Sequence, residues 1–449
     1  MSGERANTAR DIALQTVRDV FPSTPQTIER GAQDALDYRA RKANVAARDR
    51  AFATELAYGA IKMRRTLDWY LQPFIGERAS TLPSAIREVL RLAVYELVYT
   101  RPDVHATVFE WVNVAKRNGH RGVANLVNAV LRSFLRDPPL ELSRDRFDTA
   151  EEYLGTRYSL PTWLVRQWSS LFGENAERVC AAVNDPAGAA VTINALKTST
   201  GEAIERFKAD GVDADRSRWA RESVLLSDPS YARRREADAQ GTWWIQSESS
   251  AMPVDVLNPQ PGEAVLDVCS GRGNKALQTG ARMSGDGTLV CIEREDRKGI
   301  ILQRRLEQAG ITAGLVIGDA ATQLDLGSQR FDRVLIDAPC SGIGVVGRHP
   351  ETRWKKQQSD GERLSATQAK ILERIAASVE TGGALVYAVC STDPRETFEV
   401  VNTFVAQHNF ERGLIPASYE PFLTPQGDVL IPPGIDGRDG FFIARLERR

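Results

Sequence analysis

Residues 264–275 read Ala-Val-Leu-Asp-Val-Cys-Ser-Gly-Arg-Gly-Asn-Lys, an apolar run that leads into a glycine-rich turn. The run predicts a buried strand, and Gly271 and Gly273 permit a tight turn in which the backbone approaches a ligand closely. Gly271, Gly273 and Ala276 also fit the looser fingerprint of NAD(P) sites, so the turn alone leaves the choice of cofactor open. A lone turn of this kind usually belongs to some other loop, so the stretch indicates a ligand-binding turn of an α/β domain only together with the strands that follow it.

Further strands follow this one, and helices separate them. We expect helices at 296–309 and 362–380, a late β pair near 428–431 and 440–446, and strands at 264–268, 288–293, 313–317, 331–336 and 383–389. Strands that alternate with helices of this length form a parallel sheet with right-handed crossovers. Residues 246–449 are thus expected to form a Rossmann-like domain.

Two carboxylates stand where the next two strands end. Glu293 lies about 20 residues beyond the glycines, where a carboxylate can accept hydrogen bonds from ribose hydroxyls. Asp319 follows the third strand, where its carboxylate can accept from an adenine amine. Either residue alone is weak evidence, since an aspartate after a strand is usually a helix cap. With the glycine turn, the two predict a nucleoside-containing cofactor.

Two cysteines and an aspartate follow the last two strands of the series. Asp337-Ala-Pro-Cys340 comes after the fourth strand, and Cys390 comes after the fifth. Because ligands bind at the carboxyl edge of a parallel sheet, we expect Asp337, Cys340 and Cys390 to converge there. A lone cysteine is usually a buried small apolar residue, and we interpret Cys180 and Cys291 in that way.

Paired thiols at such an edge suit an attack on a pyrimidine ring. Cytosine C5 accepts a methyl group only after a thiolate has added at C6 and turned the ring into an enamine. Asp337 can stabilise the charge that develops at N3, and a second thiol can help to remove the C5 proton so that the first is eliminated. Neighbouring positive charge, such as a cofactor sulfonium, would lower the pKa of the attacking thiol.

The amino-terminal part of the chain is expected to be helical. Apolar residues recur at helical spacing in the segments 86–98, 108–115 and 123–134, as in a packed bundle. The prolines at 138 and 139 should end the last helix. We therefore expect an all-α domain over residues 1–138 and a small α+β connector domain over 139–245. The connector should contain helices at 163–172 and 199–210 and strands at 190–195 and 223–226.

Charge is unevenly distributed along the chain. Residues 1–136 hold 21 Lys and Arg against 14 Asp and Glu, whereas the remainder holds 37 against 45. A basic helical domain on an acidic enzyme suggests binding to nucleic acid. Small helical domains are often mildly basic, so the charge alone leaves RNA binding open.

Composition excludes several classes of protein. The chain has no apolar run of about 18 residues, which excludes a membrane-spanning segment. Met1–Arg10 is polar, so we expect no export signal. The five cysteines include no CxxC pair, which argues against a disulfide framework or a zinc site. We expect a cytoplasmic, metal-free monomer with reduced thiols.

Several motifs together resemble the RNA cytosine-C5 methyltransferases. These are Asp337-Ala-Pro-Cys-Ser-Gly342, the run from Gly344 to Trp354, and Cys390-Ser391. The sequence is most similar to the Sun/Fmu (RsmB-type) branch, the bacterial 16S rRNA methyltransferases, whose helical amino-terminal domain resembles the antitermination factor NusB. Segments 49–59 and 125–132 resemble that domain, and Gln246 with Ser249-Ser250 resembles the segment before the catalytic core.

The resemblance implies a role for each matching residue. Cys390 would be the nucleophile, Cys340 would help product release, and Asp337 would contact both cytosine and cofactor. S-adenosylmethionine would be held by Cys269, Ser270, Gly271, Arg272, Gly273, Asn274, Lys275, Glu293, Asp319 and Asp337. Lys275 would also steady the active site, and the Arg348–Trp354 loop would meet RNA by charge and stacking.

The sequence departs from the family pattern at two places. Arg272 replaces a proline of the glycine loop and Asn274 replaces a glycine, so a side chain at 274 could crowd the methionine end of the cofactor. Arg272 could pair with the cofactor's carboxylate or with RNA. Beyond Cys390, Glu396-Thr397-Phe398 stands where the family usually has Glu-Asn-Glu.

Small-subunit rRNA is the substrate that the resemblance implies, with rRNA processing through 5-methylcytosine as the function. Two alternatives stay open: a tRNA cytosine-C5 methyltransferase, and an RNA-binding ribosome-assembly factor whose cofactor site has degenerated through Arg272 and Asn274. Cofactor affinity would separate the enzyme from the assembly factor.

Overall fold

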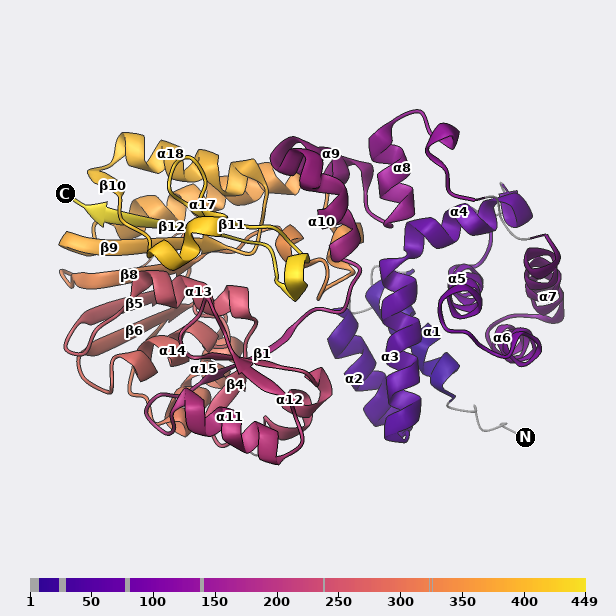
Figure 1. The fold of residues 1–449 in the computed structure, drawn as a ribbon, viewed down its shortest axis with the longest axis horizontal. Coiled ribbons are helices and arrows are strands. Elements are labelled where there is room, and N and C mark those ends of the chain that lie inside the picture. The colour runs from indigo at the N-terminus through magenta and orange to yellow at the C-terminus, as the bar shows by residue number, and fades with distance from the viewer. Residues whose placement is uncertain are drawn as a thin grey trace. The chain divides into compact units, whose positions relative to one another are not determined.

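The computed structural model describes residues 8–23, 30–76, 81–137, 141–236, 239–322, 324 and 326–449. The expected boundary at Pro138-Pro139 lies outside these residues. The chain divides into two compact units, one of residues 1–184 with 349–355 and one of residues 185–348 with 356–449. Figure 1 labels the elements of both units.

The first unit is helical throughout the part that the structure describes. Its longer helices are α1 (Ala9–Val20), α2 (Ala32–Ala43), α3 (Ala47–Lys62), α4 (Arg64–Ile75), α5 (Ser84–Tyr99), α6 (Val104–Asn118), α7 (Arg121–Arg136), α8 (Ala150–Arg157), α9 (Thr162–Phe172) and α10 (Ala176–Ala182). The predicted apolar faces of α5, α6 and α7 pack into one core. Trp111 is fully buried in it, and its indole N–H donates to Glu96 at 2.8 Å.

A short segment from the carboxyl-terminal half belongs to this helical unit. In residues 349–355, the indole of Trp354 donates to the carbonyl oxygen of Ile61 at 2.6 Å. The backbone N–H of Ala32 donates to Glu351 at 3.0 Å. The chain therefore leaves the second unit after Arg348 and returns to it at Lys356.

The second unit contains a small antiparallel sheet with the strand order β2-β3-β1-β4. Its strands are β1 (Ala189–Ile193), β2 (Ala214–Arg216), β3 (Ser223–Leu226) and β4 (Trp243–Ile245), and its helices are α11 (Thr200–Ala209) and α12 (Pro229–Arg235). Helix α11 begins where the sequence predicted, because Ser199 and Glu202 form a capping box.

The larger sheet of the second unit carries the cysteines. Its strand order is β10-β12-β9-β8-β5-β6-β7, with β11 paired to β12. The strands are β5 (Ala264–Val268), β6 (Thr288–Glu293), β7 (Gly314–Ile317), β8 (Phe331–Asp337), β9 (Val379–Val389), β10 (Phe410–Arg412), β11 (Val429–Ile431) and β12 (Phe441–Arg448). Strands β5 to β9 are parallel, and β12 is antiparallel to β9. The predicted α/β architecture is confirmed.

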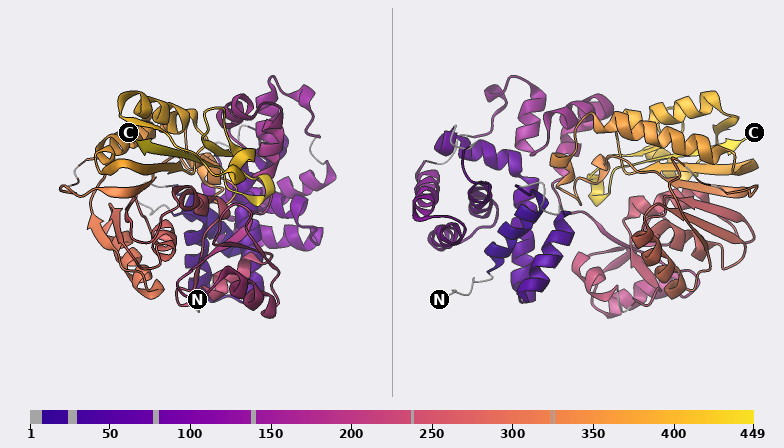
Figure 2. Two further views of the ribbon diagram at one scale, coloured as in Figure 1. Left: turned by 60° about the vertical axis from the view of Figure 1, so that its left-hand side comes forward. Right: turned by 180° about the vertical axis from the view of Figure 1, so that it is seen from behind.

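Helices cover both faces of this sheet, as Figures 1 and 2 show. Helices α13 (Glu248–Leu257), α14 (Asn274–Arg282) and α15 (Asp296–Ala309) pack on one face, in a core that contains Val265, Leu335 and Val386. Helices α17 (Asp360–Ala376) and α18 (Phe398–Gln407) pack on the other, against the alternate residues of the same strands. Successive side chains of each strand point to opposite faces of the sheet, so each strand contributes to both cores. A shift of one residue would exchange the two sets of side chains, and the strand register is therefore fixed.

One predicted element is wrong at its end. The helix expected at 362–380 stops at Ala376, and β9 already begins at Val379. Val379 is buried and pairs with Phe331, so sheet pairing replaces the helical continuation. Within the described ranges, no helix combines the length and the apolar character needed to cross a membrane.

Candidate functional site

The two cysteines that follow β8 and β9 lie together. Sγ of Cys340 is 3.3 Å from Sγ of Cys390, and both side chains are partly exposed. The geometry follows from topology, since β8 and β9 are parallel neighbours and both cysteines lie just beyond their carboxyl ends. The parallel sheet therefore brings the two thiols together, as the sequence predicted.

A buried glutamate holds the two cysteine loops together. The carboxylate of Glu396 accepts a hydrogen bond from the backbone N–H of Ser341 at 2.8 Å and another from the Ser341 hydroxyl. It also accepts from the Ser391 hydroxyl at 2.6 Å and from the Gln368 amide at 3.1 Å. Residues next to both cysteines are thus tied to one carboxylate. The family motif includes Glu396, but nothing in the sequence indicates this role for it.

Removal of this carboxylate should destabilise the second unit. Glu396→Ala leaves a buried N–H and buried hydroxyls without their acceptor, which we expect to cost about 3 kcal/mol. Scanning calorimetry should show the unfolding transition at a lower temperature. Glu399→Ala is the matched control, because Glu399 is exposed on the next helix. If Glu396→Ala and Glu399→Ala unfolded at the same temperature, the hydrogen bonds of Glu396 would not stabilise the second unit as we expect.

The environment of Cys340 keeps that thiol protonated. The hydrogen bond with Cys390, burial and the nearby charge of Glu396 raise the pKa of Cys340 well above its ordinary value. A thiol with a raised pKa is a hydrogen-bond donor near neutrality, so Cys340 can donate to the sulfur of Cys390.

Lys275 and Asp337 form an ion pair beside the thiols. Nζ of Lys275 donates to Asp337 at 2.6 Å and to the hydroxyl of Ser250 at 3.1 Å. The Lys275 side chain is 8% exposed, whereas that of Asp337 is 32% exposed. The lysine is thus a buried anchor, and the aspartate remains accessible to a ligand. In the sequence, Ser250 is marked only by the resemblance of its segment to the family.

A cavity of about 220 Å³ lies at the same sheet edge. Five of the residues predicted to bind the cofactor line it: Cys269, Gly271, Glu293, Asp319 and Asp337. The backbone N–H of Gly271 donates to Glu293 at 2.8 Å, which holds that carboxylate at the end of β6. The ends of the first four parallel strands in the chain thus supply one cavity, with carboxylates where a nucleoside needs acceptors.

The glycine turn has the strained backbone that its sequence suggests. Cys269, Gly271 and Gly273 all have positive φ values, of 62°, 60° and 89°. A Cβ atom on Gly273 would come within 2.3 Å of Leu302, so only glycine fits there. Ser270 lies within this turn, with its hydroxyl donating to the carbonyl oxygen of Asp267 at 2.8 Å.

The two altered residues of the glycine loop, Arg272 and Asn274, are not among the residues that line the cavity. The Asn274 amide donates to the carbonyl oxygen of Ile245 at 3.1 Å, and its oxygen accepts from Arg305 at 2.7 Å. Arg272 is exposed. These hydrogen bonds within the chain hold the Asn274 side chain in place.

Asp267, at the end of β5, is a feature that sequence reasoning missed. Both carboxylate oxygens are buried and have no hydrogen-bond partner among the described residues. Burial, followed by the neighbouring charge of Asp337, raises the pKa of Asp267 to about 7. A buried acceptor of this kind fits a cationic ligand group, because added positive charge would favour its ionised form. The pattern of residues offered no signal, since Asp267 resembles any polar residue at a strand end.

The raised pKa of Asp267 predicts a pH-dependent stability of the ligand-free protein. The unfolded chain loses this proton near pH 3.8, whereas the folded protein keeps it to about pH 7. The contribution of Asp267 to the free energy of unfolding is therefore largest at low pH. It decreases as the pH rises from about 3.8 to about 7 and is constant above that. Asp267→Asn should raise the melting temperature relative to wild type more at pH 8 than at pH 5. The exposed Asp286→Asn is the control, and a pH-independent difference for Asp267→Asn would refute the assignment.

One prediction about the loop after Cys340 is wrong in part. The Arg348–Trp354 loop was expected to meet RNA, but Arg353 is fully buried in the helical unit. Its guanidinium donates to Asn184 at 2.9 Å and to the carbonyl oxygen of Ser159 at 3.1 Å. Burial lowers the pKa of Arg353 to about 9. Arg353 therefore stabilises the helical unit and is not accessible to RNA.

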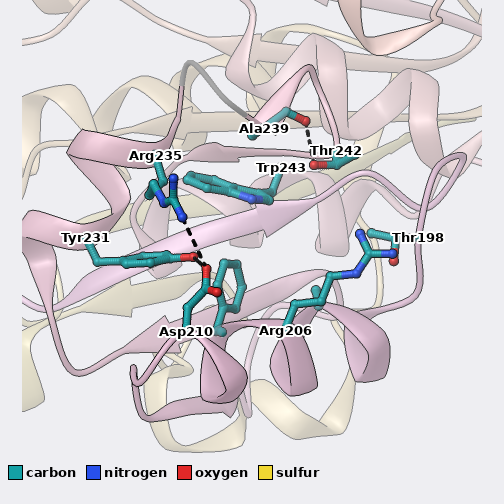
Figure 3. A pocket seen from close by; sticks show the side chains of 10 residues that line it. Thr198, Arg206, Asp210, Tyr231, Arg235, Ala239, Thr242 and Trp243 are labelled. Atoms are coloured by element: carbon teal, nitrogen blue, oxygen red, sulfur yellow. Dashed lines mark hydrogen bonds and ion pairs between the residues drawn. The ribbon is translucent and has the colours of Figure 1, made fainter.

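A further cavity, of about 270 Å³, lies in the small sheet unit and contains none of the predicted site residues. Figure 3 shows Tyr231 and Arg235 both pointing toward Asp210 at this cavity, with Arg206 on another side. Arg235 lies 3.9 Å from Asp210, so the positive charge of Arg235 is partly compensated.

All five cysteines are free thiols. Burial raises the pKa of Cys180 and of Cys269 to about 12, and raises that of Cys291 further. Among the residues that the structure describes, no three His, Cys, Asp or Glu side chains cluster in a way that could hold a metal ion.

Family models match three parts of the chain. Residues 7–136 match the NusB family, and residues 160–232 match the ferredoxin-like domain of the RsmF/B-like methyltransferases. Residues 254–447 match the 16S rRNA methyltransferase RsmB/F family. The helical unit, the small sheet and the large sheet thus each have a counterpart.

Relatives match over almost the whole length. The probable ribosomal RNA small subunit methyltransferase B of Bacillus subtilis is 32% identical, over 89% of this chain and 91% of its own. That of Synechocystis is 30% identical, over 98% and 99%. Among solved structures, the crystal structure of PH0851 has the same fold, with a TM-score of 0.83, 23% identity and 99% of both chains covered. A methyltransferase homologue from Pyrococcus horikoshii has a TM-score of 0.60 at 24% identity, over 68% of this chain and all of its own.

Proposed function

Because this chain belongs to the ribosomal RNA small subunit methyltransferase B family, we propose that it methylates C5 of a cytosine in small-subunit rRNA, with S-adenosylmethionine as methyl donor and Cys390 as nucleophile. The single observation that carries the chemistry is the pair of thiols 3.3 Å apart beside an accessible aspartate at the cofactor edge of the sheet. Cytosine C5 needs a nucleophile at C6, which this pair provides.

The cavity beside the thiols suits S-adenosylmethionine. Glu293 and Asp319 offer acceptors to a ribose and an adenine, and the unpartnered carboxylate of Asp267 lies near the turn, where it suits the positive charge of the methionine part. Of the predicted cofactor residues outside the cavity lining, Ser270 and Gly273 shape the turn and Lys275 holds Asp337. When bound, S-adenosylmethionine supplies an electrophilic methyl group on a sulfonium.

Cys390 begins the reaction in this account. The Cys390 thiol loses its proton as its sulfur forms a bond to C6 of the cytosine, and the electrons of the C5–C6 double bond shift toward N3. The carboxylate of Asp337, held by Lys275, takes up a proton and shares it with N3, so that the charge that develops there is neutralised. The ring then carries a nucleophilic C5, which takes the methyl group.

Cys340 acts at the end of the reaction. After methyl transfer, the C5 proton must leave so that the bond between Cys390 and C6 can break. Cys340 lies beside Cys390. After its own proton has passed to water, its thiolate takes up the C5 proton while the bond between Cys390 and C6 breaks, so Cys340 ends the reaction as the thiol that its raised pKa favours.

An RNA substrate must present the cytosine away from a stack. The edges of paired bases are inaccessible in the deep groove of an RNA helix, so we propose a target in a loop or in unfolded rRNA, with the base splayed out. The NusB match and the names of the relatives favour small-subunit rRNA over tRNA. We further propose that the basic domain over residues 1–138 binds RNA.

Cofactor affinity tests this proposal against a ribosome-assembly factor without catalytic activity. Isothermal titration of the purified protein with S-adenosylhomocysteine should give saturable binding, and Glu293→Ala should weaken it by about tenfold, since a carboxylate that accepts from ribose hydroxyls is lost. Asn274→Ala is the control for the altered glycine loop and should bind as wild type. Absence of binding, with or without rRNA, would favour the assembly factor.

A further inference from the structure

An open groove lies in the second unit, outside the cofactor cavity. Its volume is about 480 Å³. Four arginines line it around one tryptophan, and we call it the arginine groove: Arg216, Arg218, Arg348, Arg438 and Trp219. Neither the proposed catalytic chemistry nor the cofactor uses these residues.

Trp219 is a fixed aromatic platform in this groove. Its ring packs edge-on against Phe422 with 4.8 Å between centroids, and its carbonyl oxygen accepts from the hydroxyl of Tyr419 at 2.6 Å. The side chain remains half-buried, so part of the ring faces the groove. The guanidinium of Arg218 lies 4.9 Å from the ring centroid. A ring fixed in this way loses little entropy when a base stacks on it.

The arginines divide into paired and unpaired groups. Arg438 binds Asp436 at 2.6 Å, and Arg348 binds Asp439 at 3.2 Å. Arg216 and Arg218 are exposed, and neither forms an ion pair within the described part of the chain. The third acidic group of the lining, Glu248, accepts from Ser217 and lies 4.0 Å from Arg438. The free charge of the groove is therefore positive and lies beside Trp219.

One wall of the groove is continuous with the backbone at the nucleophile. Asp439 lines the groove, and the next residue, Gly440, donates its N–H to the carbonyl oxygen of Gly344 at 2.8 Å. Gly344 in turn donates to the carbonyl oxygen of Cys390 at 3.1 Å. A Cβ atom on Gly344 would lie 2.1 Å from the Gly440 oxygen, so the two segments touch as closely as backbones can. Backbone hydrogen bonds thus join one wall of the groove to the segment that carries Cys390.

We propose that the arginine groove binds the single-stranded RNA that flanks the target cytosine, with a neighbouring base stacked on Trp219 and backbone phosphates at Arg216 and Arg218. This inference rests on the proposed function and adds to it a subsite for the flanking strand. Unpaired guanidinium groups bind phosphates, and an aromatic face accepts any base, so the groove positions the strand without reading its sequence.

The test compares two pairs of substitutions in the same unit. Arg216→Ala with Arg218→Ala removes the free charge of the groove. Arg206→Ala with Arg235→Ala removes an equal charge from the other cavity, which Figure 3 shows. Filter binding of protein-free small-subunit rRNA measures the dissociation constant over a range of salt, and methyl transfer to the same RNA gives KM and kcat.

We expect the groove pair to raise the dissociation constant and KM by about tenfold and to reduce the salt slope by about 1.4, as for two lost phosphate contacts on a single strand. The control pair should change both constants by less than about twofold. Equal effects of the two pairs, or no effect of the groove pair, would overturn the proposal. A wild-type protein that binds rRNA but transfers no methyl group would refute the proposed function, while the binding comparison still tests the groove.

Discussion

Cys390→Ala should abolish methyl transfer. Without the sulfur that adds to C6, C5 of cytosine remains too weak a nucleophile, and we expect the rate to fall by more than about 10⁴-fold. The fold should survive, since Cys390 lies at the edge of the sheet and its side chain is only partly buried. The assay is transfer of labelled methyl groups from S-adenosylmethionine to small-subunit rRNA.

Two controls separate chemistry from folding in that experiment. Cys180→Ala removes a buried thiol in the helical unit and should keep its activity. Binding of S-adenosylhomocysteine to Cys390→Ala should match wild type, because the cavity lining does not include Cys390. Retained methylation by Cys390→Ala would overturn the assignment of the nucleophile.

Cys340→Ala should trap the protein on its RNA. The sulfur of Cys390 can still add to C6, but the thiol 3.3 Å away that takes up the C5 proton is gone. The bond between protein and RNA should then persist, and a denaturing gel should show a slow band that contains both. The fraction of protein in that band should rise from a trace in wild type to the major part in the variant.

The double variant Cys340→Ala with Cys390→Ala is the decisive control for the trapped species. It should give no slow band, because the bond that resists denaturation is the one to Cys390. If the single variant also gives no band yet methylates RNA, Cys340 has no part in release. If the double variant still gives the band, another residue forms the bond.

The sequence predicts the strands of the large sheet, and with them the edge where the proposed catalytic residues lie, because its signals are local. Each strand there is a short apolar run, and each candidate residue stands near the end of a run. The expected strand at 264–268 and helix at 296–309 have the predicted bounds. Once the strands are parallel, Cys340 and Cys390 must meet.

Other parts of the site depend on contacts that no local pattern reveals. Glu396 joins two loops that are 50 residues apart, and Asp267 owes its raised pKa to burial beneath the glycine turn. The charge of Arg353 suggests an RNA contact. Its side chain is nevertheless buried, because its segment packs among helices. The arginine groove likewise combines residues near 217, 348 and 438. Long-range packing decides each of these.

The measurement that tests the central claim most directly is methylation with isotope-labelled S-adenosylmethionine. Protein-free small-subunit rRNA and tRNA would be incubated in parallel, digested to nucleosides and analysed by mass spectrometry. The account predicts labelled 5-methylcytidine from rRNA and none from tRNA. Label in tRNA alone would contradict the substrate, label at another nucleoside would contradict the thiol chemistry, and absence of label in both RNAs would contradict the enzymatic function.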